Sequence, residues 1–280
     1  MICLKCHSYG NLFFLVKYFS NISFFLFKIN LFFNFDQLIS FCSYSNGIFF
    51  LRIFNRDATE AFNCLNGIRC FSFYVFSKIK CSKIKICVGG NIYFVYKKGF
   101  NIFILCKKYS NFLMFFFYRY LFFRNLFGNY QLNFYLVKNF YFNIFCLGNY
   151  HILFICNISD KFINFSRYLN NFNFSNLFIS YHQIFLYIFN YICFYFYIIG
   201  YNISFFNLLS NIVFTFERGS GITKSCGSGT FSSCVNYCIF VSLNFFRLCS
   251  YFGTLCFFNF NNLFFIKGKC YLLGYLFLNF

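Results

Sequence analysis

Residues 168–216 form a run of 49 residues without a single Lys, Arg, Asp or Glu. A water-facing surface of ordinary composition cannot be built over such a stretch, because roughly a quarter of the residues in soluble domains are charged. Its centre, 183–200, approaches the roughly 20 apolar residues that a helix needs to cross a bilayer. The run therefore predicts membrane-spanning helices.

Apolar, uncharged stretches recur along the rest of the chain. Hydrophobic residues make up 60% of it and charged residues 10%, and Phe alone occurs 57 times. Two N-terminal stretches, 11–27 and 31–51, are weaker candidates because they contain Lys17 and Asp36. The candidate spans are 139–159, 183–200, 202–216, 225–246 and 248–266.

These stretches predict mainly α-helical, membrane-type hydrophobic segments, because only helices and closed barrels satisfy the backbone inside lipid. The membrane is then the expected location and the lipid bilayer the expected partner, and no other ligand or partner is inferred. A chain without a defined native fold is the alternative, since Phe-rich runs without Pro are also typical of aggregating segments.

Segment 52–108 differs in character, because it carries eleven basic residues and two acids. Within it, two β-prone runs flank Gly89 and Gly90, and a Gly-Gly pair supplies the positive φ of a tight hairpin turn. The sequence therefore predicts a β-hairpin at 83–96, which positive-inside asymmetry would place on the cytoplasmic side of a membrane. The chain divides into an apolar region 1–51, this basic segment, and an apolar region 109–280.

One motif with cofactor chemistry lies at the N-terminus. Cys3, Cys6 and His7 match C-x-x-C-H, the two thiols and axial imidazole that attach a c-type haem. With 17 cysteines in the chain, and no export signal or second axial ligand evident, we interpret the match as coincidental. No cofactor is predicted.

Other motifs are weaker. Residues 219–225 (GSGITKS) resemble a phosphate-binding loop, but Thr stands where Gly must precede the Lys, so a flexible polar loop is predicted. His151 and His182 lie in Phe-rich runs as isolated polar residues. Five clustered cysteines lack the pair spacing of a zinc site, so no metal or catalytic residue is predicted; they are Cys226, Cys234, Cys238, Cys249 and Cys256.

The leading functional interpretation is an open reading frame without a selected product, and no enzyme is predicted. Phe codons read on the complementary strand encode Lys and Glu. The strand opposite a Lys- and Glu-rich gene would therefore be T-rich and would contain a Phe-rich reading frame like this one. The first alternative is a multi-pass integral membrane protein. A weaker alternative is a nucleic-acid-binding segment at 52–108, where basic residues would contact phosphates and aromatic residues would stack on bases.

Overall fold

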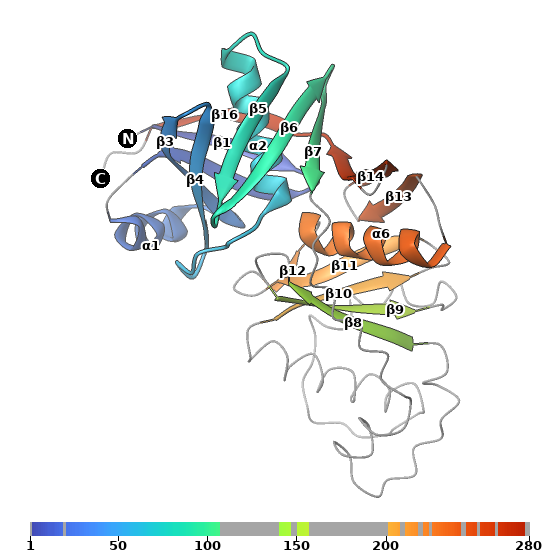
Figure 1. The fold of residues 1–280 in the computed structure, drawn as a ribbon. Helices are drawn as coiled ribbons and strands as arrows, with labels where there is room; N and C mark the ends of the chain where they lie inside the picture. Colours follow the sequence, from blue (N-terminus) through green and yellow to red (C-terminus); the bar gives the residue numbers. More distant parts are fainter. Residues whose placement is uncertain are drawn as a thin grey trace, which may run out of the picture.

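The computed structural model describes residues 2–18, 21–106, 140–146, 150–156, 201–207, 211–217, 221–223, 226–241, 245–250, 253–260 and 263–277. Within these residues the chain forms a 16-stranded sheet and three helices, α1 (Ile22–Phe32), α2 (Leu65–Lys78) and α6 (Gly227–Val241) (Figure 1). The strands are β1 (Ile2–Ser8), β2 (Asn11–Lys17), β3 (Gln37–Ser45), β4 (Ile48–Asn55), β5 (Lys83–Val88), β6 (Asn91–Lys98), β7 (Asn101–Cys106), β8 (Phe140–Cys146), β9 (Tyr150–Cys156), β10 (Asn202–Asn207), β11 (Ile212–Glu217), β12 (Gly221–Thr223), β13 (Phe245–Ser250), β14 (Gly253–Phe260), β15 (Leu263–Gly268) and β16 (Tyr271–Phe277).

The sheet is built as two halves, each packed on its own helix. The path runs β16-β1-β2-β3-β4-β5-β6-β7 and continues β15-β14-β13-β11-β10-β9-β8, with β12 paired to β11. Helix α2 contacts β1, β2, β3, β7 and β16, whereas α6 contacts β9, β10, β11, β13 and β14 (Figure 1). The last strand, β16, pairs with the first strand, β1, and β15 pairs with β7, so the end of the chain joins the two halves of the sheet.

Strand β2 shows why the sheet is hard to see in the sequence. Four consecutive residues, 13–16, are buried. Phe13 and Leu15 belong to the apolar cluster around α2, while Phe14 and Val16 belong to a second cluster around α1. Because helices cover both faces of this strand, the apolar–polar alternation of a half-buried strand is absent.

The predicted membrane helices are wrong. Span 139–159 contains strands β8 and β9, 202–216 contains β10 and most of β11, 225–246 contains α6, 248–266 contains parts of β13 to β15, and 183–200 lies outside the described residues. Helix α6 has 15 residues, about 22 Å, against a hydrocarbon core of about 30 Å. Among the described residues, no helix is long and apolar enough to cross a membrane. The predictions of a membrane location and of a bilayer partner depended on those helices and are contradicted.

Segment 52–108 is an integral part of the first half of the sheet. Strands β5 and β6 pair antiparallel through the expected Gly89–Gly90 turn, where both glycines have positive φ (+54° and +79°). Around this hairpin the segment supplies the end of β4, all of α2, and β7. It is therefore not a separate nucleic-acid-binding module. The division of the chain at 51/52 and 108/109 stays a prediction.

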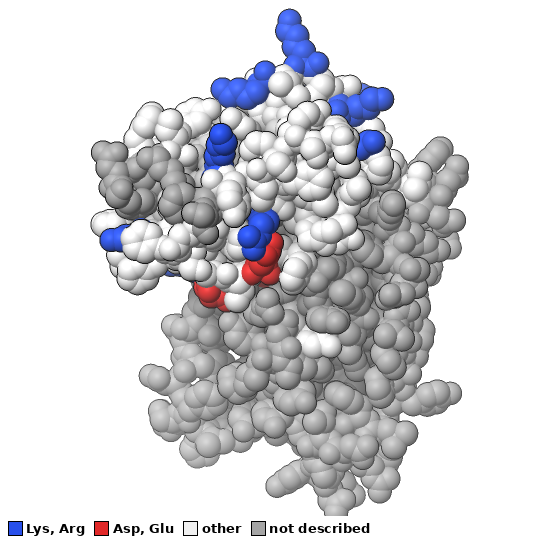
Figure 2. Space-filling view, turned by 60° about the vertical axis from the view of Figure 1, so that its left-hand side comes forward, with Lys and Arg blue, Asp and Glu red and all other residues white. Residues whose placement is uncertain are grey.

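Several Lys and Arg side chains gather at one end of the molecule, at the top of Figure 2. Lys78 lies in the last turn of α2, where a cation complements the negative end of the helix dipole. An open hollow of about 670 Å³ lies at this end of α2, with Phe76, Lys80 and Lys97 in its lining. The opposite end of α2, its N-terminus, is capped by a cysteine, Cys64.

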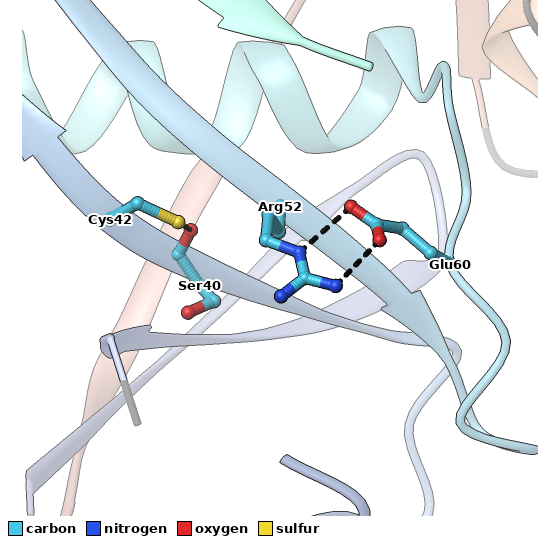
Figure 3. Close-up of polar contacts among 4 residues, drawn as sticks. All are labelled: Ser40, Cys42, Arg52 and Glu60. Atoms are coloured by element: carbon cyan, nitrogen blue, oxygen red, sulfur yellow. Dashed lines mark hydrogen bonds and ion pairs between the residues drawn. The ribbon is translucent and has the colours of Figure 1, made fainter. Parts of the chain in front are cut away.

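An ion pair joins Arg52 on β4 to Glu60 in the loop that leads into α2. Arg52 donates from Nε to Glu60 Oε1 (3.0 Å) and from Nη2 to Glu60 Oε2 (2.7 Å), a bidentate geometry (Figure 3). The guanidinium also lies 4.8 Å from the centre of the Phe54 ring, and Phe54 forms an isolated antiparallel bridge with Glu60. This pair fixes the loop four residues before Cys64, the N-cap of α2.

Candidate active site

Helices α2 and α6 begin in the same way, with a cysteine immediately before the first helical residue. The Cys64 thiol accepts a hydrogen bond from the Gly67 N–H (3.2 Å), and the Cys226 thiol accepts one from the Gly229 N–H (3.3 Å). In each case the cysteine carbonyl accepts the N–H of the residue four positions later. The two helix N-termini therefore share a Cys-x-x-Gly cap.

Cysteine is an unusual choice at this position. Ser, Thr, Asp and Asn cap helices best, because their oxygens accept the free N–H groups of the first turn. A thiol is a weaker acceptor, but its thiolate is stabilised by the positive end of the helix dipole. Cysteine at both caps therefore favours a chemical role over a structural one.

The two helix N-termini lie against each other. A Cβ added at Gly227, the first residue of α6, would lie 2.9 Å from Asn66 Oδ1 and 3.0 Å from Leu65 Cβ, in the first turn of α2. Only glycine allows this approach without a shift of the neighbouring atoms. Cys64 and Cys226, each adjacent to this contact, are thus brought into one region.

One carboxylate acts on both thiols. Burial raises the pKa of Cys64 to about 12, and Glu217 at the end of β11 adds to the rise, while the Gly67 N–H and Arg69 oppose it. Burial also raises the pKa of Cys226, again with Glu217 adding to it and with hydrogen bonds from Ser228 and Gly229 opposing it. The thiols and Glu217 therefore belong to one site. Both thiols hold their protons strongly, and each thiolate, once formed, is a strong base.

Buried polar side chains surround these groups. Asn66 donates from Nδ2 to Asn11 Oδ1 (2.7 Å), which links α2 to the first residue of β2. On the other half, Ser204 Oγ and Thr215 Oγ1 lie 3.0 Å apart on β10 and β11. A Cβ at Gly229 would collide with both hydroxyls, so α6 packs closely on these strands next to Cys226.

His151 is a buried, neutral member of this second half. It faces Asn202 across the parallel pair β9–β10, with Asn202 Nδ2 3.4 Å from His151 Nε2. Burial lowers the pKa of His151 to about 3, so the imidazole carries no charge near neutral pH. The sequence had indicated only an isolated polar residue here.

The C-x-x-C-H residues are placed apart. Cys3 lies in the apolar cluster around α1 and Cys6 in the cluster around α2, because residues three apart in a strand face opposite sides. His7 stacks on Tyr271, with ring centroids 4.9 Å apart. The structure does not bring these three residues together.

The polar loop and the clustered cysteines lie on several different elements of the fold. Residues 221–223 of the polar loop form strand β12, paired antiparallel with β11. Of the clustered cysteines, Cys226 caps α6, Cys234 and Cys238 lie within it, and Cys249 and Cys256 lie on β13 and β14. Within the described residues no group of metal-ligating side chains could hold an ion. His182 lies outside the described residues.

The prediction that the chain has no catalytic residue stays a prediction; it did not single out Cys64 and Cys226, whose helix starts lie against each other in the structure. Two signals could have found this pair: Cys64 and Cys226 share the spacing Cys-x-x-Gly, and an acidic residue precedes each of them, Glu60 by four positions and Glu217 by nine. Against 17 cysteines neither signal stands out.

The fold is that of the PhzF and proline racemase type. A predicted epimerase from Pseudomonas aeruginosa has a TM-score of 0.65 at 8% identity, covering 99% of this chain and 98% of that one. A phenazine biosynthesis protein of the PhzF family from Enterococcus faecalis has a TM-score of 0.60 at 11% identity, covering 99% of each chain. A hydroxyproline epimerase from Agrobacterium vitis, with bound trans-4-hydroxy-L-proline, has a TM-score of 0.58 at 9% identity, covering 99% of this chain and 91% of that one. Neither protein-family sequence models nor the sequences of curated proteins match this chain.

These likenesses correct the functional interpretation. A product without selection has no reason to adopt, along 99% of its length, the fold of these proteins, so the interpretation as a spurious reading frame is wrong. The prediction that the chain is not an enzyme is contradicted too, since the neighbours include epimerases. The alternatives of a multi-pass membrane protein and a nucleic-acid-binding segment fall with the fold described above.

Proposed function

We propose that this chain is a racemase or epimerase that inverts a carbon centre next to a carboxylate, with Cys64 and Cys226 as its acid–base pair. One observation carries the proposal: two helix N-termini, each capped by a thiol, abut at Gly227 and Asn66. Inversion of a stereocentre by proton transfer needs a base on one face of the carbon and an acid on the other. Two thiols from opposing halves of a fold supply that arrangement.

The reaction balances with these two groups alone. One thiolate takes the proton from the carbon and becomes a thiol, leaving an electron pair that is delocalised into the adjacent carboxylate. The second thiol delivers its proton to the opposite face and becomes the thiolate. The free N–H groups of the two helix N-termini are suited to bind the carboxylate and to stabilise the charge that develops on it.

The substrate class follows from the same groups and from the structural neighbours. The helix N-termini favour an anionic group, and the buried amides of Asn11 and Asn66 offer neutral donors and acceptors beside it. The hydroxyproline epimerase with this fold holds an imino acid, trans-4-hydroxy-L-proline. An α-amino or α-imino acid is therefore the class that supports the proposal best.

The test is exchange of the α-hydrogen in D₂O, measured by NMR on single enantiomers of the amino acids, proline and 4-hydroxyproline. We expect exchange with inversion for at least one of them, and a loss of about 10²-fold or more in Cys64→Ser and in Cys226→Ser. Cys87→Ser, at a half-buried thiol on β5, is the matched control and should retain the activity. Exchange that persists in both site variants would overturn the assignment.

A further inference from the structure

Arg69 is a fully buried cation in the second turn of α2. Within the described part of the chain no carboxylate pairs with it; the ion pair found there joins Arg52 and Glu60. Burying a charge without a carboxylate partner is costly, and the positive N-terminal half of a helix does nothing to offset that cost. Such a residue calls for a reason other than stability.

The side chain of Arg69 is fixed from several elements. Its Nη2 donates to Asn66 Oδ1, and its guanidinium lies 6.0 Å from the Tyr9 ring centre. The Tyr9 hydroxyl in turn accepts the Lys269 N–H (2.8 Å). A Cβ at Gly268 would lie 3.0 Å from Arg69 Nε, so the backbone at the end of β15 packs closely against the guanidinium.

The bond to Asn66 connects Arg69 with the site. Because Asn66 Oδ1 accepts from Arg69, its Nδ2 is left to donate to Asn11, and the amide is held in one orientation. Asn66 is also the residue against which Gly227 packs. Arg69 thus supports the contact between the two helix N-termini through its hydrogen bond to Asn66.

We propose that Arg69 is a positioning residue of this site, which fixes the Asn66 amide and places a buried positive charge next to the helix start that Cys64 caps. The proposal rests on the proposed function only in taking Cys64 as one of the two reacting thiols. The charges that face this thiol are Arg69 on α2 and Glu217 on β11. They act in opposite directions, Arg69 favouring the thiolate and Glu217 the thiol.

A third cysteine, Cys270, responds to the same cation. Burial raises the pKa of Cys270, but a hydrogen bond from Cys70, the charge of Arg69 and a hydrogen bond from Ser8 outweigh burial and lower it. The lowered pKa favours the Cys270 thiolate, whose negative charge offsets part of the positive charge of Arg69. Replacing Cys270 by an uncharged residue should therefore favour the Cys64 thiolate.

The experiment measures the rate of alkylation of Cys64 by iodoacetamide at pH 8, followed by peptide mass spectrometry of the full-length protein without substrate. Cys87 on β5 is the internal control. In Arg69→Gln we expect Cys64 to react about three- to tenfold more slowly, because loss of the positive charge raises the pKa of Cys64 and lowers its thiolate fraction. Arg69→Lys keeps the charge and should restore the rate to within about twofold.

Cys270→Ala changes only a small side chain and decides the question if Arg69→Gln does not fold. In it we expect Cys64 to react about two- to threefold faster, with Cys87 unchanged. Unchanged Cys64 rates in the folded variants, or equal changes at Cys64 and Cys87, would overturn the proposal. These rates need no turnover, so a failure of the proposed epimerase activity would be seen separately, in the D₂O exchange.

Discussion

Gly227 and Asn66 join the two halves of the fold at the N-termini of their helices. A Cβ at Gly227 would lie 2.9 Å from Asn66 Oδ1 and 3.2 Å from the Asn66 backbone nitrogen. Gly67, in the first turn of α2, meets only side-chain atoms, with Ile53 Cδ1 3.2 Å and Cys64 Sγ 3.3 Å from its added Cβ. The same substitution at the two positions should therefore have different consequences.

We predict that Gly227→Ala destabilises the protein by about 1–3 kcal/mol, because backbone and a fixed amide must move. Gly67→Ala is the matched control and should stay within about 1 kcal/mol, since a side-chain end can shift and alanine gains helix propensity. Urea denaturation measures both changes. Equal stabilities of the two variants would show that the helix N-termini are not in contact.

His151 should make the protein less stable in mild acid. Its pKa is about 3 in the folded chain, against about 6.5 when unfolded, so below pH 6.5 the unfolded state binds a proton that the folded state does not. Its contribution to the free energy of unfolding falls by about 1.4 kcal/mol per pH unit, or about 2 kcal/mol at pH 5.

Denaturant unfolding at pH 7 and pH 5 measures this loss. His151→Gln should lose about 2 kcal/mol less than the wild type between the two pH values. His7→Gln is the control, because His7 on β1 is only half-buried and burial lowers its pKa without a large shift. The prediction is wrong if His7→Gln and His151→Gln show the same dependence on pH.

The ion pair between Arg52 and Glu60 should contribute little to global stability. The side chains are 46% and 28% exposed, so solvent screens the attraction despite its bidentate geometry. A double-mutant cycle with Arg52→Met and Glu60→Gln should give a coupling energy of about 0.3–1 kcal/mol. A coupling above about 2 kcal/mol would mean that the pair is shielded from solvent.

The fold could be predicted from the sequence only where backbone geometry forces a residue type. The Gly89–Gly90 turn could be predicted because a two-residue hairpin turn needs positive φ, which glycine adopts readily. Strand β2 was not, because helices cover both of its faces and apolar residues fill both. Helix α6 is equally hard to recognise, since its first turns are rich in Gly and Ser, and the buried hydroxyls of Ser232 and Ser233 donate to the carbonyls of Ser228 and Gly229.

The site was harder to predict than the fold. Cys64 and Cys226 are 162 positions apart, and only the packing of α6 against the start of α2 makes them partners. Charge counting also misled, because it drew attention to the uncharged run 168–216 and gave no role to Glu217, the acid that follows this run directly. In the structure its carboxylate raises the pKa of both Cys64 and Cys226.

The most direct test of the central claim is the position of deuterium during turnover in D₂O, starting from one enantiomer. If Cys64 and Cys226 act as two separate bases, the product enantiomer formed at early times carries one deuterium at the inverted carbon, and the remaining substrate carries none. Mass spectrometry after chiral separation measures both. Deuterium appearing equally in substrate and product would contradict the account, because a single base exchanging with solvent would then serve both faces.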